Sequence, residues 1–401
     1  MNDSAWTNAD PDAPHTCPTC GGGELSKVVR VPRMPVICNV LHRTREAAMS
    51  APRGDIDLAH CEACGMVFNA AFDPGLMHYD AVYENALHFS AQFREYAERL
   101  AQGLVAGFGL QGKRIVELGC GDGSFLSRLC ELGGSEGVGF DPAFDPARSA
   151  IKPGVSARVV RELYTSKTKL PPPDFVSCRH VLEHITSPRD FLADLRRALP
   201  DGAGVYFEVP NCGYMLEQLA IWDIIYEHCN YFTGEALRSL FARAGFEVLG
   251  AAGTYGGQFL GLRARAGSPL ARAEAPDDRA HALAHAFARE HHTKLVHWRS
   301  RLDQWRGAGA RVVLWGAGSK GVTFLNTFAD ELRDGRVLAH AVDLNPRKQG
   351  CFIAGTGQEV IAPARLRDVR PAVVLAMNPL YVEEIRASLG EFQVRAEVVV
   401  A

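Results

Sequence analysis

The sequence predicts an α/β protein in which two separate parallel sheets, each covered by helices, follow a small metal-binding module. Strand-like apolar segments alternate with amphipathic segments over residues 76–265 and again over residues 311–401. Such alternation is typical of parallel sheets. Paired cysteines and several prolines are concentrated in residues 15–75. The length of 401 residues exceeds the roughly 250–300 residues at which one hydrophobic core stops growing, so we expect several domains.

Composition and charge exclude several classes of protein. With 47% hydrophobic and 22% charged residues, the chain is neither mostly disordered nor collagen-like nor a coiled coil. The net charge of −3 provides no global field for nucleic acid or an anionic membrane, so neither is an expected partner. The first 14 residues lack a basic start with an apolar stretch, and no apolar run is long enough to span a membrane. We therefore expect a cytoplasmic chain with reduced cysteines.

Two Cys-x-x-Cys pairs follow an expected disordered tail at residues 1–14: Cys17 with Cys20, and Cys61 with Cys64. Two such pairs complete a closed tetrahedral four-sulfur zinc site, which stabilises a fold rather than catalysing a reaction. A glycine after each pair permits the tight turn under the metal. The alternatives are four free buried thiols or a thioredoxin-like redox pair, and the redox pair lacks its strand–helix context here. Four further side chains are lesser candidates that we expect not to be ligands: His15, Cys38, His42 and His60.

A glycine-rich turn, Gly119-Cys-Gly-Asp-Gly123, follows an apolar strand that contains Glu117. Glycines let the backbone approach a ligand, and the helix that follows offers unpaired N–H groups. The spacing is neither that of a dinucleotide turn nor that of a phosphate loop. Asp141 ends the next strand, where an acidic side chain can accept hydrogen bonds from ribose hydroxyls. A later strand ends in the run Cys178–His184.

Together, the runs ELGCGDG at 117–123, FD at 140–141 and CRHVLEH at 178–184 resemble class I S-adenosylmethionine-dependent methyltransferases. Another nucleotide-binding α/β domain is the alternative. The resemblance implies that Gly119 and Gly121 pass under the methionyl group, that Asp141 binds the ribose and that residues 161–162 lie by the adenine. The cofactor site predicted in this way comprises Glu117, Gly119, Cys120, Gly121, Asp122, Phe125, Asp141, Pro142, Glu162, Arg179 and His180.

A second constellation, WDIIYEHCNYFT at 222–233, follows the strand that ends before Asn211. A histidine can move a proton near neutral pH, and an adjacent carboxylate can hold its tautomer. The alternative is that Tyr226, Tyr231 and Phe232 pack in the core while His228 ends an element. Because the run lies behind a methyl-donor site, we favour catalysis.

The chain also resembles, over nearly its whole length, the sugar C-methyltransferases of antibiotic deoxysugar pathways. That family has a zinc-binding N-terminal domain, a methyltransferase domain and a C-terminal Rossmann-like domain. The resemblance places the general base on His228, the glutamate before it on Glu227 and a second histidine on His184. The family has Tyr-His before Glu-His, whereas this chain has Ile-Tyr, so Tyr226 stands one residue later. The expected divisions are a tail 1–14, a zinc module 15–75, a methyltransferase domain 76–265, a linker helix 266–310 and a Rossmann-like domain 311–401.

A second glycine-rich turn, Gly316-Ala-Gly-Ser-Lys-Gly321, follows a strand and has Asp343 at the end of the next one. It fits a dinucleotide fingerprint, which would imply NAD(P) and a redox reaction. The segment is short for a dehydrogenase, and 342–350 matches the VDLNPxKQG run of the resembled family. We therefore favour a substrate-binding or structural role. The predicted substrate-binding residues are Tyr79, Tyr83, Asn211, Tyr231, Gly316, Gly318, Ser319, Lys320 and Asp343.

The linker segment contains His281 and His285, which are four residues apart and could share a metal. No carboxylate or third histidine is clearly placed with them in the sequence, so we expect a solvated helix face.

The preferred hypothesis is an S-adenosylmethionine-dependent C-methyltransferase with a structural zinc, acting beside the carbonyl of a nucleotide-linked keto-deoxysugar. His228, oriented by Glu227, would remove the α proton. His184 or a tyrosine (Tyr226, Tyr79 or Tyr83) would stabilise the enolate. A second hypothesis is C-, O- or N-methylation of a non-sugar metabolite. A third is a zinc ribbon that directs the enzyme to a macromolecule. The last lacks support because residues 15–75 have no dense run of Lys and Arg.

Overall fold

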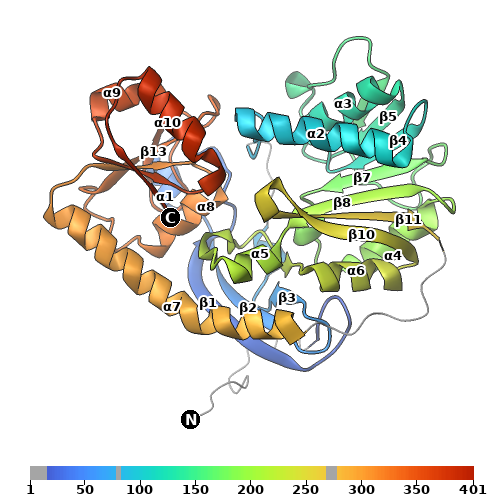
Figure 1. The fold of residues 1–401 in the computed structure, drawn as a ribbon, viewed down its shortest axis with the longest axis horizontal. Helices are drawn as coiled ribbons and strands as arrows, with labels where there is room; N and C mark the ends of the chain where they lie inside the picture. Colours follow the sequence, from blue (N-terminus) through green and yellow to red (C-terminus); the bar gives the residue numbers. More distant parts are fainter. Residues whose placement is uncertain (1–15, 78–82, 268–277) are drawn as a thin grey trace.

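The computed structural model describes residues 16–77, 83–267 and 278–401, which form three β-sheets with helices packed on them (Figure 1). A small antiparallel sheet lies at the bottom of the view, and a larger α/β unit stands above it on each side. The predicted tail at 1–14 and Tyr79 lie outside the described residues.

The small sheet combines strands from two distant parts of the chain. Three strands come from the N-terminal segment, and the fourth, β9, comes from the segment that contains His228. Val67 of β3 pairs with Tyr231 of β9. The N-terminal module is therefore completed by the middle of the chain. Its elements are β1 (Leu25–Pro35), α1 (Arg45–Met49), β2 (Arg53–Cys61), β3 (Val67–Asn69) and β9 (Asn230–Tyr231).

The middle unit is a seven-stranded sheet in the order β10-β11-β8-β7-β4-β5-β6. Strands β4 to β8 are parallel, so their carboxyl ends meet at one edge, where ligands of such sheets bind. Helices α2 and α3 pack on one face, and α4 and α6 pack on the other (Figure 1). The strands are β4 (Arg114–Leu118), β5 (Glu136–Phe140), β6 (Ala157–Val160), β7 (Phe175–Arg179), β8 (Gly204–Pro210), β10 (Phe246–Thr254) and β11 (Phe259–Ala266). The helices are α2 (Ala91–Phe108), α3 (Ser124–Gly133), α4 (Pro188–Ala198), α5 (Cys212–Glu217) and α6 (Gly234–Arg243).

The C-terminal unit is a five-stranded, fully parallel sheet in the order β14-β13-β12-β15-β16. The long helix α7 leads into it and packs against β1 and α5, burying Phe287, Trp298 and Leu302. These side chains share one apolar core with β1 and α8. The strands are β12 (Val312–Trp315), β13 (Leu338–Val342), β14 (Glu359–Ile361), β15 (Val373–Ala376) and β16 (Glu397–Val400). The helices are α7 (Asp278–Gly307), α8 (Ser319–Thr327), α9 (Leu366–Val369) and α10 (Val382–Glu391).

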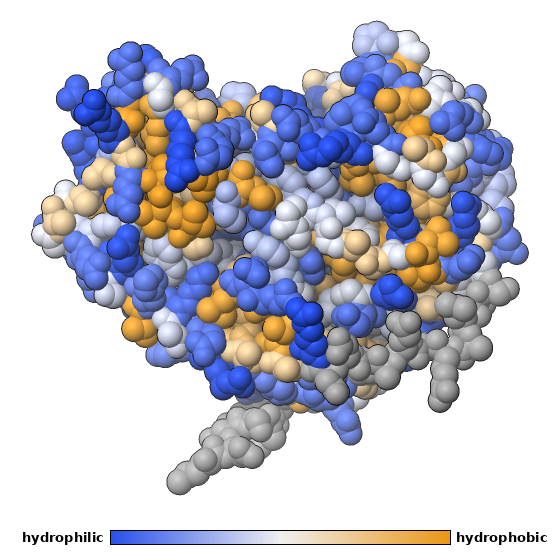
Figure 2. Space-filling view, viewed as in Figure 1, coloured by the Kyte–Doolittle hydropathy of each residue, from blue (hydrophilic) through white to orange (hydrophobic). Residues whose placement is uncertain are grey.

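Short 3-10 helices connect these elements, and two of them, η3 and η4, carry residues of the predicted site. None of the helices in the described parts of the chain is both long and apolar enough to cross a membrane. On the face shown in Figure 2, apolar side chains gather in separate patches surrounded by polar ones. The 3-10 helices are η1 (Pro74–Leu76), η2 (Pro146–Arg148), η3 (Leu182–His184), η4 (Ile221–Asp223), η5 (Tyr255–Gly257), η6 (Pro363–Arg365) and η7 (Pro379–Tyr381).

The two α/β units are present as predicted, but the sheet of the middle unit and the surroundings of the linker helix differ from the sequence predictions. The middle sheet is mixed, because the hairpin of β10 and β11 pairs antiparallel with β8. The prediction that His281 and His285 lack a carboxylate partner is wrong, because both lie beside Glu62 of the N-terminal module. Sequence spacing within one helix could not show a partner more than 200 residues away.

Candidate active site and metal centre

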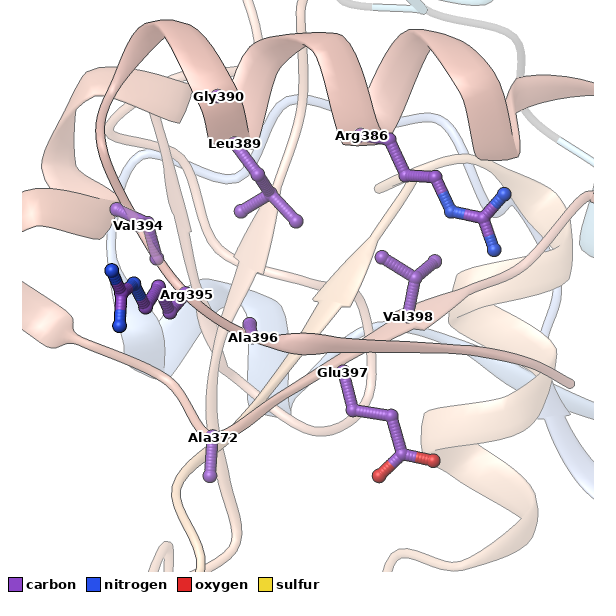
Figure 3. Close-up of a pocket in the computed structure, with 9 residues that line it drawn as sticks. All are labelled: Ala372, Arg386, Leu389, Gly390, Val394, Arg395, Ala396, Glu397 and Val398. Carbon is purple, nitrogen blue, oxygen red and sulfur yellow. The ribbon is translucent and has the colours of Figure 1, made fainter.

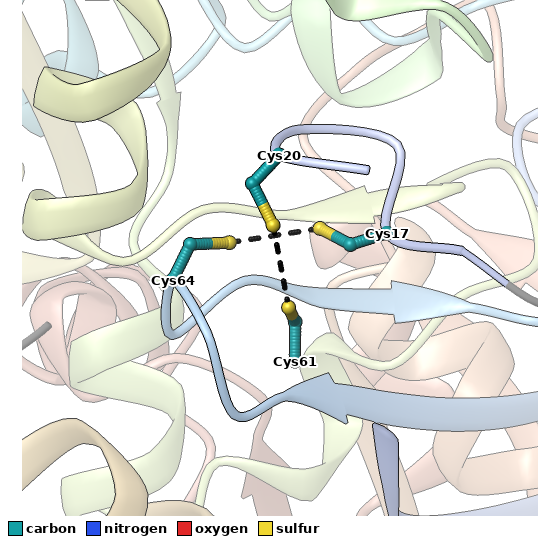
Figure 4. A group of neighbouring side chains, drawn as sticks. All are labelled: Cys17, Cys20, Cys61 and Cys64. Atoms are coloured by element: carbon teal, nitrogen blue, oxygen red, sulfur yellow. Dashed lines mark hydrogen bonds between the residues drawn. The ribbon is translucent and has the colours of Figure 1, made fainter. Parts of the chain in front are cut away.

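The four predicted cysteine ligands lie together, in the turns before β1 and between β2 and β3 (Figure 4). The Sγ atoms of Cys17 and Cys64 are 3.6 Å apart, as are those of Cys20 and Cys61. Tetrahedral zinc with Zn–S bonds of about 2.3 Å requires S···S distances of about 3.8 Å. Backbone N–H groups of Thr19 and Gly22 also point at the sulfurs of the first pair. The donor set and its geometry therefore fit a closed zinc site.

The predicted cofactor turn connects β4 to α3. Gly119 has a φ of +66°, and a Cβ there would lie 2.2 Å from Val181, so only glycine fits. A Cβ on Gly121 would project into open space. The Gly121 N–H donates to an Asp141 carboxylate oxygen over 2.8 Å. The second Asp141 oxygen accepts from the Ala143 N–H over 2.8 Å. The turn thus leaves room at the helix N-terminus, with a carboxylate at its rim, as a ribose-bearing cofactor requires.

The other predicted cofactor residues differ in exposure. Glu117 is buried at the end of β4, and burial raises the pKa of its carboxyl to about 8 against the charge of Arg179. Cys120 packs against Gly139, and burial raises the pKa of its thiol well above the usual range. Asp122 caps the turn by accepting from the Ser124 N–H. Pro142 and Glu162 are exposed at the same edge of the sheet.

A buried carboxylate that the sequence analysis did not single out, Glu208, organises the carboxyl end of β8. It accepts hydrogen bonds from the hydroxyls of Tyr96 and Tyr206, and Arg179 Nε lies 3.1 Å away. Arg179 in turn lies over the Phe125 ring, 4.1 Å from its centre. Burial alone would raise the pKa of Glu208, but the Arg179 charge and these hydrogen bonds lower it well below its usual range. Glu208 is therefore ionised and holds Arg179 beside the cofactor turn.

Glu208→Ala should cost about 3–5 kcal/mol of unfolding free energy, because it leaves the nearly buried Arg179 unpaired. A matched control is Glu98→Ala, which removes an exposed pair with Arg128 and should cost at most about 1 kcal/mol. Urea unfolding followed by circular dichroism measures both. Equal losses in the two variants would show that Glu208 is not a structural anchor.

His180 connects this network to the predicted catalytic histidines. Its Nε2 lies 3.3 Å from Glu208, and its Nδ1 lies 3.6 Å from Glu183. Burial disfavours its charged form, but the two carboxylates raise the pKa of His180 to about 9. Its backbone has a φ of +55°, which is strained for a histidine and is held by the N–H bond to the Glu208 carbonyl.

His184 and His228 form a pair with Glu183. The two rings are 5.0 Å apart, edge to face, and the ligand atoms of all three residues lie within 4.8 Å of one another. His184 Nδ1 is 2.8 Å from the Glu227 carbonyl oxygen, so it carries the proton of that hydrogen bond. Burial, and after it the His184 charge, lower the pKa of His228 to about 3. The same three side chains are of the types that bind a divalent cation.

Glu227 and Tyr226 do not lie where the sequence analysis expected them. The carboxylate near His228 is Glu183, while the buried Glu227 carboxyl faces Cys38 and Tyr83. Burial raises the pKa of Glu227, against the lowering effect of His184. Tyr226 is fully buried, and its hydroxyl accepts from the Asp73 N–H over 2.9 Å. Tyr226 therefore anchors the segment instead of facing the histidine pair.

Among the predicted substrate residues, Asn211 and Tyr231 make local contacts. The Asn211 side chain caps α5 and donates to the Gly257 carbonyl over 2.8 Å. The Tyr231 hydroxyl donates to the Ile225 carbonyl over 2.8 Å and is buried. Tyr231 therefore shapes the loop that carries His228, whereas Asn211 joins the start of α5 to η5.

The second glycine-rich turn lies against the middle unit. Asp343 accepts from the Ala317 N–H over 3.0 Å, and the buried Lys348 donates to the Ala317 carbonyl over 3.1 Å. Lys320, at the start of α8 between Ser319 and Gly321, pairs with Asp223 of η4 at 2.7 Å. The turn thus connects to the segment that leads to His228. Gly316 has a φ of +110°, and Gly318 forms the N-cap of α8.

A separate surface hollow lies between α10 and β16, lined by Arg386, Leu389, Val394 and Glu397 among others (Figure 3). None of its lining residues belongs to the cofactor turn or the histidine pair. The hollow therefore gives no information on the chemistry at the edge of the middle sheet.

Two family models match the chain. Residues 90–251 match a model described as a methyltransferase domain, and residues 273–401 match one described as a C-methyltransferase C-terminal domain. The second match covers the unit that contains Gly316 and Asp343. The predicted methyltransferase fold class is therefore confirmed, and the C-terminal unit is of a type that occurs in C-methyltransferases.

Curated relatives match over part of the middle unit. The ubiquinone biosynthesis O-methyltransferase of Pectobacterium carotovorum is 28% identical over 109 residues, which is 26% of this chain and 45% of the relative. The tRNA U34 carboxymethyltransferase of Ectopseudomonas mendocina is 32% identical over 148 residues, or 34% of this chain and 46% of the relative. The chain thus spans about half the length of the curated relatives it matches.

Solved structures of several methyltransferases are also similar. A methyltransferase of Aquifex aeolicus is 18% identical and covers 47% of this chain and 100% of its own, with a TM-score of 0.35. The 1,6-didemethyltoxoflavin-N1-methyltransferase of Burkholderia thailandensis is 17% identical and covers 51% and 96%, with a TM-score of 0.36. By the two family models, residues 90–251 form a methyltransferase domain and residues 273–401 form a C-methyltransferase C-terminal domain.

Proposed function

We propose that the protein is an S-adenosylmethionine-dependent C-methyltransferase that deprotonates a carbon next to a carbonyl group and methylates it. The observation that carries this proposal is a continuous series of contacts from the cofactor turn to the histidine pair. It runs from Phe125 through Arg179, Glu208 and His180 to Glu183. An ionisable pair next to a methyl-donor turn is the arrangement that proton removal before carbon methylation requires.

The residues around the turn fit the cofactor. Gly119 and Gly121 would let the backbone pass close to it, and Asp141 would accept hydrogen bonds from its ribose hydroxyls. When bound, S-adenosylmethionine supplies an electrophilic methyl group.

The histidine pair would handle the proton. His228 accepts the α proton of the substrate, and the carboxylate of Glu183 compensates the positive charge that forms on the ring. The Nδ1–H of His184 is held by the Glu227 carbonyl, so its Nε2, once protonated, can donate to the enolate oxygen. Glu227 therefore positions His184, a different role from the orientation of His228 that the sequence suggested.

We propose a nucleotide-linked keto-deoxysugar as the substrate. The turn from Gly316 to Gly321 with Asp343 has the form of a nucleotide-binding turn, and it lies against the segment of the catalytic loop through Lys320 and Asp223. A substrate held there by its nucleotide would place its sugar toward the middle unit. Tyr83 interacts with the Glu227 carboxyl of the catalytic loop and is the described tyrosine that we propose contacts the sugar.

The direct test is incubation of the full-length protein with S-adenosylmethionine and a panel of carbonyl compounds. The panel contains nucleotide-linked keto sugars, the same sugars without the nucleotide, and non-sugar ketones and phenols. Mass spectrometry reports the gain of one CH2 group, and fragmentation or NMR locates it on carbon, oxygen or nitrogen. Carbon methylation of nucleotide-linked sugars is expected. Methylation of only the phenols would replace the proposal with O-methylation of a non-sugar metabolite.

Asp141→Ala should weaken the binding of S-adenosylmethionine by about 10- to 100-fold, since it removes about 1.5–3 kcal/mol of hydrogen bonding to a charged acceptor. The matched control is Glu136→Ala, at the exposed opposite end of the same strand β5. Isothermal titration calorimetry with S-adenosylhomocysteine measures both. Unchanged affinity in Asp141→Ala would remove Asp141 from the cofactor site.

The pH profile should also be unusual for a histidine base. Burial, and then the charge of His184, lower the pKa of His228 to about 3, so the ring is neutral and able to accept a proton above that value. We therefore expect that protonation of His228 causes no loss of kcat/KM between about pH 8 and about pH 5. An acid limb near pH 6.5 in the wild type would show that His228 keeps an ordinary pKa.

A further inference from the structure

A second cluster of potential metal ligands lies apart from both the cysteine site and the histidine pair. It consists of His60 at the end of β2, Glu62 just after it and His281 on the first turn of α7. His285, one turn later on the same helix, lies beside Glu62. Successive residues of an extended strand point to opposite faces, so His60 and Glu62 face away from the side on which Cys61 joins the cysteine site. The cluster is thus a separate group of side chains.

The donor atoms of the cluster converge. His60 Nε2 and His281 Nδ1 are 2.7 Å apart, and His281 Nδ1 is 3.1 Å from one oxygen of Glu62. The other oxygen of Glu62 is 3.7 Å from His285 Nε2. The ligand atoms of His60, Glu62 and His281 all lie within 4.8 Å of one another.

These distances are close to those of a metal site. Zinc with bonds of about 2.0–2.1 Å in tetrahedral geometry separates its ligand atoms by about 3.3–3.4 Å. The two imidazoles would therefore have to separate by about 0.7 Å, which small rotations of the side chains provide. Histidines four residues apart on a helix are a recurrent pair of zinc ligands. His60 is fully buried, while His281 and Glu62 are partly exposed, so an ion could enter from the α7 side.

We propose that His60, Glu62, His281 and His285 bind a second zinc ion, which joins α7 to the N-terminal module. Three imidazole nitrogens and one carboxylate oxygen are donors that suit zinc, and four protein ligands make a closed, structural site. The ion would fix the beginning of the helix that leads into the C-terminal unit. The competing arrangement is a hydrogen-bonded group of the same side chains with no metal.

The first test is the zinc content of the full-length protein after dialysis. Wild type should contain about two equivalents of zinc, and His281→Ala/His285→Ala should contain about one. The matched control is His292→Ala/His297→Ala, which removes two exposed histidines of the same helix and should retain about two. Equal zinc in wild type and the His281/His285 variant would overturn the proposal.

Cobalt substitution assigns the ion that is lost. The four-cysteine site gives intense thiolate-to-cobalt charge-transfer absorption, which a site made of imidazole and carboxylate lacks. The His281/His285 variant should therefore lose one cobalt equivalent and keep the charge-transfer band. Loss of that band together with the metal would show that the variant had disrupted the cysteine site, and would count against a second site.

Discussion

Replacing His228 with alanine should lower kcat by about 10²- to 10⁴-fold, the usual contribution of a general base. The reason is geometric, because His228 is half-buried against His184 and Glu183, at the end of the contacts that lead from the cofactor turn. The His228 ring is not part of the cofactor turn at residues 119–123, so the affinity for S-adenosylhomocysteine should be unchanged. Steady-state kinetics on the substrate found in the panel measure the first effect, and calorimetry measures the second.

Proton exchange gives a readout that a purely structural role would not change. In deuterated water without S-adenosylmethionine, the wild type should exchange the α proton of its substrate, and His228→Ala should not. Asn230→Ala serves as a folding control, because Asn230 holds the same loop through the Ile185 carbonyl without belonging to the pair. Near-normal turnover or exchange in His228→Ala would exclude His228 as the base.

We propose that the four cysteines hold a structural zinc ion, so Cys64→Ser should release it and unfold the small sheet. Structural zinc sites bind with apparent free energies of about 10–16 kcal/mol in small zinc domains, whereas whole domains are stable by about 5–15 kcal/mol. The effect should extend beyond the N-terminal segment, because β9 belongs to that sheet and precedes α6. We therefore expect a lower Tm and strongly reduced turnover, measured by calorimetry and the methylation assay.

The control for the cysteine variant is Cys130→Ala, which removes another buried thiol far from the four-sulfur group. It should keep its zinc and lose only about 1 kcal/mol of stability, as expected for a small cavity. A Cys64→Ser protein that keeps one zinc in the four-cysteine site, together with the wild-type Tm, would contradict the structural role of that site.

Local patterns in the sequence predicted the features that local chemistry determines. The cysteine spacing predicted the four-sulfur group because each pair lies within one turn, and the glycines at 119–123 predicted the turn because only glycine adopts its backbone. Alternating strands and helices predicted the two α/β units because the periodicity of apolar residues is also a local property of the sequence.

Residue spacing along the sequence could not predict which distant segments come into contact in the fold. Glu183 was read as part of a strand-end run, yet it is the carboxylate that lies with His228, 45 residues later in the numbering. Predicting the buried polar network around Glu208 would have required the strand order, in which β7 and β8 are neighbours. Tyr226 has a residue type suited to catalysis, but whether its hydroxyl faces a site or Asp73 depends on packing with the N-terminal segment.

The insertion of β9 into the small sheet has a consequence for how the protein folds as it is synthesised. The ribosome releases β1, β2 and β3 about 160 residues before Asn230–Tyr231. Until then, the edge of β3 lacks its partner strand and is open to other pairings. Zinc bound early to the four cysteines would hold the three-strand intermediate in register, so zinc supply during translation should affect the yield of native protein more than zinc added afterwards.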